Sequence, residues 1–470
     1  MQELCRNNIV RHFNNRRAEY VLGFIGLSFG VMVSLLIVKF SLLELPLIIL
    51  AVLVLLFLTF KYPEAILALF LTSGAFKTFG LLRSVSSVFD ITVLLGVFCL
   101  LGILYKIQKT GESYTIFPKM PLLLFFSILI MLSLSFTYSS AKIYGTEKLF
   151  KLLTLTTFSF VAPFFLVKTT ESFQRFLKVF LVIGILMFVD VLIRGLNARF
   201  IGFYSALGAN YLMFGRIEGF AIIACMFYFL INSNSTLKKV AYFTTTISFL
   251  FSLLLSASRG PLISLIVSIA FLSLYSIAIF VANRGKNTTE RVYAAKTINI
   301  TLTFVIIIIV LVSFFGDYFA TLFYRFAMIQ QGIEESLVVR LSMYNKAIEV
   351  LLSFPKNLIG IGLGGYSVLY TGVDSKMYPH NIFLEIASES GIFALLAFVV
   401  LVSIVVLQVV KEIRSADSIL LKSTKMTIMG LFIYMLINAS FSLDINDNRL
   451  LFTVMSLVFS VGEAKKIEKR

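Results

Sequence analysis

One histidine in the second half of the chain has the most suggestive chemistry. His380 lies in the stretch MYPHNIFLEIASESG, residues 377–391, directly before a long apolar run. The other of the two histidines, His12, lies in a basic N-terminal segment. Because the unperturbed pKa of histidine is about 6.5, His380 suits the removal of a proton from a hydroxyl group near neutral pH. We therefore expect a general base here, and a hydrogen-bonded structural histidine is the alternative.

The residues that follow His380 could support such a base. Asn381 is placed to orient a substrate, and Glu385 and Glu389 follow at helical spacing, from which they could tune the imidazole ring. No set of His, Cys, Asp and Glu residues has the spacing of a metal site, so we predict no bound metal.

Arg259 has the strongest features of an anion-binding residue. It lies in the motif SASRG between two apolar runs, where an arginine is costly and usually has a partner. Its planar guanidinium fits phosphate oxygens bidentately, and Ser256 and Ser258 offer hydroxyl groups. A helix beginning near Pro261 would add its dipole to the same site. The alternative is a short turn from which Arg259 reaches the membrane interface.

Four other basic residues allow two interpretations each. Arg216 either binds a phosphate or a sugar or pairs with Glu218, and Arg340 is either an anion ligand or a surface charge. Lys148 and Lys151 suit either anchoring at a membrane interface or contact with a diphosphate.

Two further motifs lie near the end of the chain and before His380. Asp444 and Asp447, in SLDINDNR, either cap a helix or bind substrate hydroxyl groups. The glycine-rich run NLIGIGLGGY, residues 357–366, lacks the strand–turn–helix context of a nucleotide-binding loop. We predict a turn packed close to the membrane surface.

The composition indicates that a lipid bilayer surrounds these residues. The 470-residue chain is 59% hydrophobic and 14% charged, which is too apolar for a soluble protein of this length. Its net charge of +17 would suggest nucleic acid in a soluble protein, but here the basic residues separate apolar runs. We therefore interpret them as determinants of membrane topology and predict no nucleic-acid partner.

Apolar runs long enough to cross a membrane recur along the whole chain. The predicted spans are 20–40, 42–60, 63–81, 88–105, 120–138, 149–167, 176–193, 211–232, 240–257, 261–283, 298–315, 388–410, 426–441 and 450–463. Lys and Arg concentrate in alternate connections, which places both termini in the cytoplasm. No cleavable signal peptide is evident, and basic tails are expected at 1–19 and 464–470.

One connection is much longer than the others and is expected outside the cytoplasm. Residues 316–387 contain RLSMYNKAIEVLLSFP, residues 340–355, in which Leu341, Tyr344, Ala347, Ile348 and Leu351 recur at helical spacing before Pro355. The sequence thus predicts an all-α polytopic membrane protein. It would have 12–14 transmembrane helices, eleven of them within 20–315 and the rest within 388–463, around one external catalytic loop with short amphipathic helices.

The second half of the chain resembles the O-antigen ligase/polymerase family, the Wzy/WaaL-like group. Three motifs carry the resemblance in order over residues 250–405: SASRG, the Arg340-led helix followed by NLIGIGLGGY, and PHNIFLEIASESGIFALLAFV. The segment SFTYSSAKIYGTEKLFKLL, residues 135–153, is similar to a family segment with less specificity.

The resemblance implies a GT-C-like membrane glycosyltransferase that needs neither a nucleotide sugar nor a metal. Its substrates would be glycans on undecaprenyl diphosphate at the outer face of the bacterial inner membrane. His380 would deprotonate the acceptor hydroxyl, and Arg259, Arg216 and Arg340 would hold the lipid diphosphate. Sugar contacts are expected at these positions: Asn381, Glu389, Asp444 and Asp447.

The acceptor is what separates the members of this family. A polymerase transfers the glycan to another lipid-linked repeat unit, and the number of spans favours this activity. The alternatives are a ligase that uses lipid A-core and, in a different class, a flippase for lipid-linked oligosaccharides. A polymerase would be expected to work beside a flippase and a chain-length regulator.

Overall fold

The computed structural model describes residues 44–86, 90–110, 117–198, 203–283, 289–332 and 334–462. The predicted span 20–40 and the two predicted basic tails lie outside these ranges. The chain divides into two compact units, Met1–Leu58 and Thr59–Arg470. Every residue of the candidate site belongs to the second unit.

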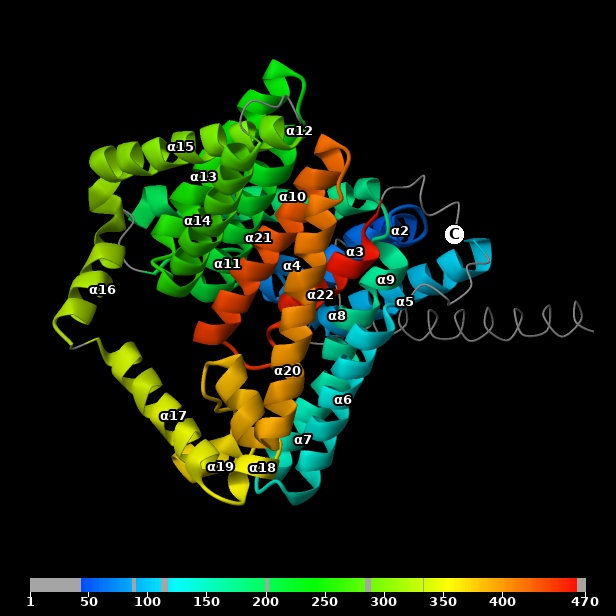
Figure 1. Ribbon diagram of the computed structural model, residues 1–470, viewed down its shortest axis with the longest axis vertical. Helices are drawn as coiled ribbons and strands as arrows, with labels where there is room; N and C mark the ends of the chain where they lie inside the picture. The colour runs from blue at the N-terminus through cyan, green and yellow to red at the C-terminus, as the bar shows by residue number, and fades with distance from the viewer. Residues whose placement is uncertain are drawn as a thin grey trace, which may run out of the picture. The chain divides into compact units, whose positions relative to one another are not determined.

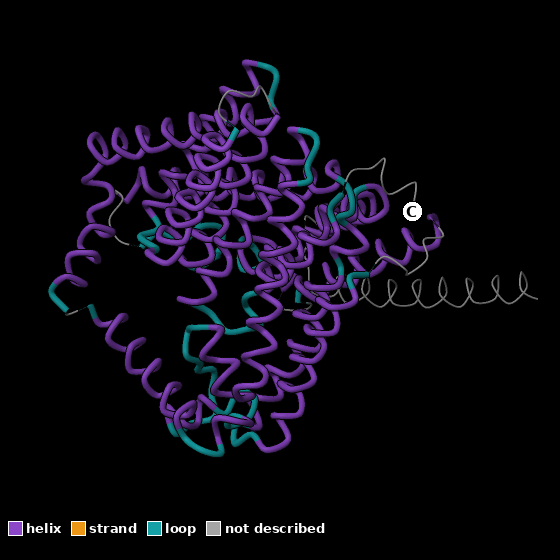
Figure 2. The backbone as a smooth tube through the Cα atoms, in the orientation of Figure 1, coloured by secondary structure: helices purple, strands orange, loops and turns teal. Residues whose placement is uncertain are grey.

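The elements of the described residues are helices, and no strand occurs among them (Figure 2). The N-terminal helices are α2 (Glu44–Lys61), α3 (Pro63–Thr72), α4 (Gly80–Ser86), α5 (Ile91–Thr110), α6 (Lys119–Ser135), α7 (Lys142–Lys151), α8 (Thr157–Val161), α9 (Pro163–Leu166) and α10 (Thr170–Ala198). The middle helices are α11 (Tyr211–Ala224), α12 (Leu230–Asn232), α13 (Thr236–Leu255), α14 (Arg259–Ala282), α15 (Thr289–Phe315) and α16 (Ala320–Gln330). The last helices are α17 (Glu335–Leu352), α18 (Lys356–Ile359), α19 (Tyr366–Thr371), α20 (Ile382–Arg414), α21 (Ile419–Phe441) and α22 (Arg449–Ser460).

Nine helical stretches of the described residues are long and apolar enough to cross a membrane, and three shorter apolar helices accompany them. The protein is therefore an all-α polytopic membrane protein, as predicted. Two of the predicted spans differ from the helices that the structure shows. The helix at 63–81 ends at Thr72, and the span at 149–167 is part of a longer stretch, Lys142–Leu166, that includes a π-helical segment at Leu152–Thr156.

The helices differ in how much of their surface is buried by protein. In the stretch Tyr211–Asn232, which begins with α11, 94% of the most apolar part is buried inside the protein, and in α21 this share is 72%. In the stretch Thr289–Gln330 it is only 11%. Apolar side chains on the outer helices can face lipid at no cost, because lipid tails are as apolar as they are. The packed core therefore lies around α11 and α21, and α15 lies at its edge (Figure 1).

A kink in α20 receives the glycine-rich turn. Gly391 has a φ of 82° inside α20, and a β-carbon there would lie 2.0 Å from the carbonyl oxygen of Leu358. The carbonyl oxygens of Ser388 and Glu389 accept hydrogen bonds from the backbone N–H groups of Ile361 and Gly362 at 2.9 and 3.0 Å. The predicted turn thus packs, backbone against backbone, on the first half of α20.

Helices α17, α18 and α19 of the loop contact α20, and α18 and α19 lie near α7, whereas α16 lies away from them (Figure 1). On α17 the buried face differs from the predicted one: Met343, Ala347 and Val350 are buried, whereas Leu341 and Ile348 are exposed. The apolar spacing in the sequence allowed two adjacent faces, and packing of Met343 and Ala347 against Tyr366 of α19 selects one of them.

Candidate functional site

His380 lies in a strained turn just before α20. Its φ is 58°, in the left-handed region that costs a residue with a β-carbon about 1–2 kcal/mol. Its ring lies against that of Tyr378, with 4.5 Å between the ring centroids. Nδ1 is buried and has no hydrogen-bond partner within the described part of the chain. Strain and an unpaired buried nitrogen are both more typical of binding sites than of structural histidines.

The charges around His380 keep its ring neutral. Burial and the positive charges of Arg340 and Lys376 lower the pKa of His380 to about 4. The ordinary value of about 6.5, on which the sequence argument rested, therefore does not apply. At pH 7 the imidazole is present in the form that accepts a proton.

The loop between α21 and α22 brings two carboxylates to the same region. Lys376 Nζ lies 2.7 Å from Asp447 Oδ2 and 4.0 Å from Asp444 Oδ2. Burial and the nearby charge of Asp447 raise the pKa of Asp444 above its ordinary value. Burial also acts to raise the pKa of Asp447, but the ion pair with Lys376 outweighs it and holds that pKa below its ordinary value. Neither aspartate caps α22, since Asn448 is the residue at its N-cap.

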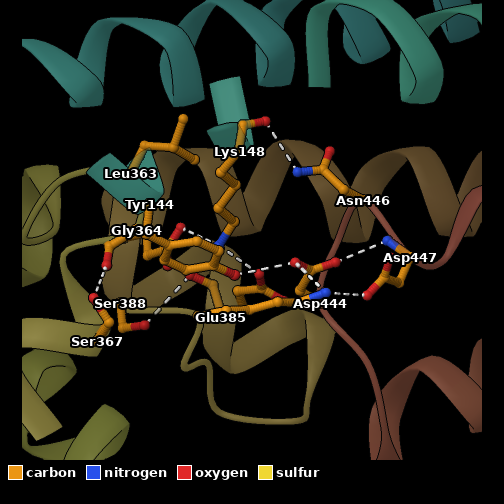
Figure 3. Close-up of polar contacts among 12 residues, drawn as sticks. Tyr144, Lys148, Leu363, Gly364, Ser367, Glu385, Ser388, Asp444, Asn446 and Asp447 are labelled. Carbon is orange, nitrogen blue, oxygen red and sulfur yellow. Dashed lines mark hydrogen bonds and ion pairs between the residues drawn. The ribbon is translucent and has the colours of Figure 1, made fainter. Parts of the chain in front are cut away.

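A buried network joins this loop to α7 and α20 (Figure 3). Lys148 Nζ lies 2.5 Å from Glu385 Oε1 and 2.6 Å from Glu389 Oε2, and all three side chains are at most 1% exposed. One turn earlier on α7, the Tyr144 hydroxyl group donates to Asp444 Oδ2 at 3.0 Å. Lys148 is therefore neither an interface anchor nor an exposed diphosphate ligand, and the two glutamates pair with it rather than with the histidine ring.

Arg216, buried on α11, holds the same loop from the other side. Its Nη2 donates to the carbonyl oxygens of Asn438 and Ser442 at 3.0 and 3.1 Å, and its Nη1 to Asn448 Oδ1 at 3.3 Å. The ion pair with Glu218 suggested by the sequence is not formed, because both carboxyl oxygens of Glu218 lack a partner. In this arrangement Arg216 positions the loop that carries the two aspartates.

Arg259 belongs to a second ion cluster. Helix α14 begins at Arg259 rather than at Pro261. The Nη2 atom of Arg259 lies 2.6 Å from Glu334 Oε1 and 3.0 Å from Ser336 Oγ. Burial raises the pKa of Glu334, but hydrogen bonds from Arg259 and Ser336 outweigh it and bring that pKa to about 2. Arg325 of α16 donates to the carbonyl oxygen of Ala257 in the same turn at 2.7 Å. A carboxylate of the chain thus takes the place expected for an external anion.

Asn381 forms hydrogen bonds within the protein, whereas the side chain of Arg340 forms none with the described residues. Arg340 is half-buried on α17 and has no hydrogen bond or ion pair to any residue the structure describes. Asn381 is the N-cap of α20, and its Oδ1 accepts from the backbone N–H groups of Phe383 and Leu384 at 3.0 and 3.1 Å. Of the three predicted arginines, only Arg340 presents an unpaired guanidinium near the histidine.

The structure adds residues that the sequence argument did not identify as site residues. Lys376 and Tyr378 flank His380, and Tyr144 joins the buried network. A signal for the network was present, since Glu385 and Glu389 lie in an apolar run and ionisable groups there need a partner. The partner could not be identified from local sequence.

The described residues contain no group of three or more His, Cys, Asp and Glu side chains arranged to hold a metal ion. What the arrangement offers is a neutral imidazole, an unpaired guanidinium and an ion-paired carboxylate within one region. These groups can accept a proton, stabilise an anion and hydrogen-bond hydroxyl groups.

Comparison with known proteins gives one family. Residues 244–399 match the O-antigen ligase family, whose members are membrane glycosyltransferase-like enzymes. No curated protein matches the chain. The matched segment extends from α13 into α20, so it contains the strained histidine, the loop helices and two of the three arginines, but not the loop of Asp444 and Asp447. On this match, the segment with Arg259, Arg340 and His380 is similar to the O-antigen ligase family, which supports the resemblance seen in the sequence.

Proposed function

We propose that this protein is a surface-polysaccharide polymerase of the bacterial inner membrane. It would transfer a glycan from undecaprenyl diphosphate to a hydroxyl group of a second lipid-linked repeat unit at the outer face, with both termini in the cytoplasm. The observation that carries the proposal is the neutral imidazole of His380, with its unpaired Nδ1, beside the unpaired Arg340 in the segment that matches the family.

The proposed reaction uses each of these groups in a defined step. The imidazole of His380 takes the proton of the acceptor hydroxyl group, whose oxygen attacks the anomeric carbon of the donor sugar. The bond from that carbon to the diphosphate oxygen breaks, and the electron pair leaves with the diphosphate. Arg340 stabilises the negative charge that develops there. No strong acid is needed, because the diphosphate is already a good leaving group.

Binding of the diphosphate would also make His380 a stronger base. The charges of Arg340 and Lys376 contribute to the low pKa of the free imidazole. A bound diphosphate between these cations would offset their charge and raise that pKa. The base would then gain strength only when the donor is present.

The other predicted ligands receive supporting roles. Arg216 would act through the loop that it holds, and Arg259 would bind the diphosphate only after release from Glu334. Asp447, paired with Lys376, and Asn381 would contact sugar hydroxyl groups, whereas Glu389 would act through Lys148. A flippase and a chain-length regulator are the protein partners that such a polymerase would require.

One specific observation favours a second candidate. The family that matches residues 244–399 is described as O-antigen ligase, so transfer to lipid A-core is the alternative. The donor half of the reaction would be the same, and only the acceptor would differ.

The test is a reaction with one purified undecaprenyl-diphosphate repeat unit and the purified protein. Wild type should give a ladder of products, His380→Gln should give none, and His12→Gln should match wild type. Equal thermal unfolding temperatures in detergent would establish that the inactive variant is folded. A ladder from folded His380→Gln would exclude His380 as the base, and transfer only when lipid A-core is supplied would make the protein a ligase.

A further inference from the structure

A groove lies on an exposed side of the middle helices, apart from the candidate site. It has a volume of about 400 Å³, which is within the range of ligand pockets, and lies between α13, α15 and the segment that joins α11 to α12. These helices lie together in the green part of the ribbon in Figure 1. The proposed reaction makes no use of this groove.

The walls of the groove are apolar along most of its length. Met226, Ile231 and Phe304 form buried parts of the lining. The hydroxyl groups of Thr246 and Thr303 donate to carbonyl oxygens of their own helices at 2.7 and 2.8 Å. Because those hydroxyl groups are already satisfied, the threonines offer mainly their methyl groups. Asn299 is exposed in the lining three residues after Lys296, and a hydrocarbon chain can contact the remaining walls without leaving a polar group unpaired.

Positive charge is confined to one end of the groove. Lys239 lies in the first turns of α13 and Lys296 in the second turn of α15, while the other lining residues of these two helices follow them in the sequence. The ammonium group of Lys239 has no hydrogen-bond partner among the residues described here, and Lys296 Nζ lies 3.4 Å from the carbonyl oxygen of Ile231. Among the described residues that line the groove, none is Asp or Glu.

The dimensions match one chain of a membrane lipid with its headgroup at the end of the helices. The lining residues of α15 run from Lys296 to Ile307, about 16 Å at 1.5 Å per residue. Lys239 is the fourth residue of α13, so the positive end of that helix dipole adds to its charge. Unfilled apolar space of this size would forfeit dispersion contacts, so a bilayer chain is the natural occupant.

We propose that this groove is a binding site for an anionic phospholipid of the bilayer, with its phosphate on Lys239 and Lys296 and one acyl chain between α13 and α15. Two lysines near a membrane surface should favour an anionic over a zwitterionic headgroup on the order of tenfold. The lipid would connect α13 and α15 beside the segment that joins α11 to α12, and it would stabilise the helix pair without entering the reaction.

The absence of tryptophan from the sequence allows a direct test. The variant Phe243→Trp places a single tryptophan in the lining of the groove. This variant is reconstituted in phosphatidylcholine vesicles that contain increasing fractions of a dibrominated lipid, which quenches tryptophan fluorescence on contact. Dibrominated phosphatidylglycerol should quench the fluorescence at about a tenfold lower fraction than dibrominated phosphatidylcholine. The control is Phe126→Trp on α6, at a lipid-facing residue outside the groove, which both lipids should quench equally.

Further variants and competitors separate the possible outcomes. Adding Lys239→Gln and Lys296→Gln to Phe243→Trp should abolish the preference for phosphatidylglycerol. Equal quenching of Phe243→Trp by both lipids would overturn the proposal. Relief of quenching by free glycerol phosphate would also overturn it, because this would indicate a site for the headgroup alone. Stronger competition by undecaprenyl phosphate than by phosphatidylglycerol would overturn it as well, because this would indicate a site for the substrate chain.

Native mass spectrometry provides a measurement that does not depend on the tryptophan variant. Wild-type protein in an equimolar mixture of phosphatidylglycerol and phosphatidylcholine should retain mainly phosphatidylglycerol. The Lys239→Gln, Lys296→Gln double variant should lose this preference, and retention of the preference by a folded double variant would contradict the assignment of the phosphate to these lysines.

Discussion

At the scale of single residues, His380 combines a strained backbone, an unpaired nitrogen and a low pKa. The two cations beside it contribute to the low pKa, so the charge environment can be tested apart from catalysis. Because the sequence contains only His12 and His380, His12→Gln leaves a single imidazole to follow by NMR.

We expect that imidazole to titrate near pH 4 in the free protein. Arg340→Met should raise the pKa, because a nearby positive charge disfavours the imidazolium form. The control is Lys346→Met on the same helix, whose lysine pairs with Glu349 at 2.7 Å and should leave the titration unchanged. An unshifted titration in Arg340→Met would remove Arg340 from the environment of the base.

The same low pKa affects stability. The unfolded chain binds a proton on this histidine at about pH 6.5 and the folded chain only near pH 4. The contribution of His380 to folding is therefore fully present above pH 6.5 and is lost progressively as the pH falls from 6.5 toward 4. Unfolding measured over this range should depend less on pH in His380→Gln than in wild type, and parallel curves would contradict the low pKa.

Lys148 is the second residue whose role can be isolated. Lys148→Met would leave the buried carboxyl groups of Glu385 and Glu389 without their cation, which typically costs about 3–5 kcal/mol. Lys151→Met on the same helix breaks only an exposed pair with Glu147 and should cost at most about 1 kcal/mol. Denaturant unfolding in detergent would compare them, and similar losses would show that the buried network contributes little.

At the scale of elements, the kink of α20 and the glycine-rich turn act as one unit. A β-carbon at Gly391 would overlap the backbone of Leu358, whereas one at Gly372, with a similar φ of 74°, would meet nothing within 4 Å. Both glycines need the left-handed backbone, but only Gly391 also needs the space.

We therefore expect Gly372→Ala to cost only the backbone strain of about 1–2 kcal/mol, and Gly391→Ala to cost clearly more. Because the turn leads from α17 toward His380, Gly391→Ala should also reduce glycan transfer, while Gly372→Ala should affect it less. Thermal unfolding and the transfer reaction measure the two effects. Equal behaviour of the two variants would mean that the turn can move away from α20 freely.

At the scale of the whole molecule, the charges at the end of α20 predict the side of the membrane on which the site lies. The part of α20 after the kink at Gly391, residues 392–414, extends about 35 Å, enough to cross the bilayer, and Lys411 and Arg414 lie in its last turn. The positive-inside rule predicts that these residues lie on the cytoplasmic side, and we therefore expect the loop helices before α20 outside.

Accessibility to a thiol reagent tests this orientation. In a background without Cys5, Cys99 and Cys225, we expect Lys356→Cys to react with an impermeant maleimide from the outside of intact spheroplasts. Asp417→Cys, just after α20, should react only after permeabilisation. The reverse pattern would place the loop in the cytoplasm and exclude a reaction at the outer face.

The sequence by itself determined the features that depend on neighbouring residues. Apolar runs predicted the helices, since a membrane helix must satisfy its own backbone and present an apolar surface, both of which are local properties. Local motifs were also sufficient to identify the family segment with His380 and Arg259, and to predict a tight turn at the glycine-rich run.

Only the tertiary structure decided which charges meet. Lys148 and Glu389 are 241 positions apart, and Tyr144 and Asp444 are 300 positions apart, so no local pattern pairs them. Arg216, Arg259 and Arg340 looked alike as candidate anion ligands, yet the fold ties the first to a loop, the second to Glu334, and leaves the third free beside the histidine. The physical reason is that a buried charge takes its partner from whichever helix packs against it, and helix packing depends on the whole chain.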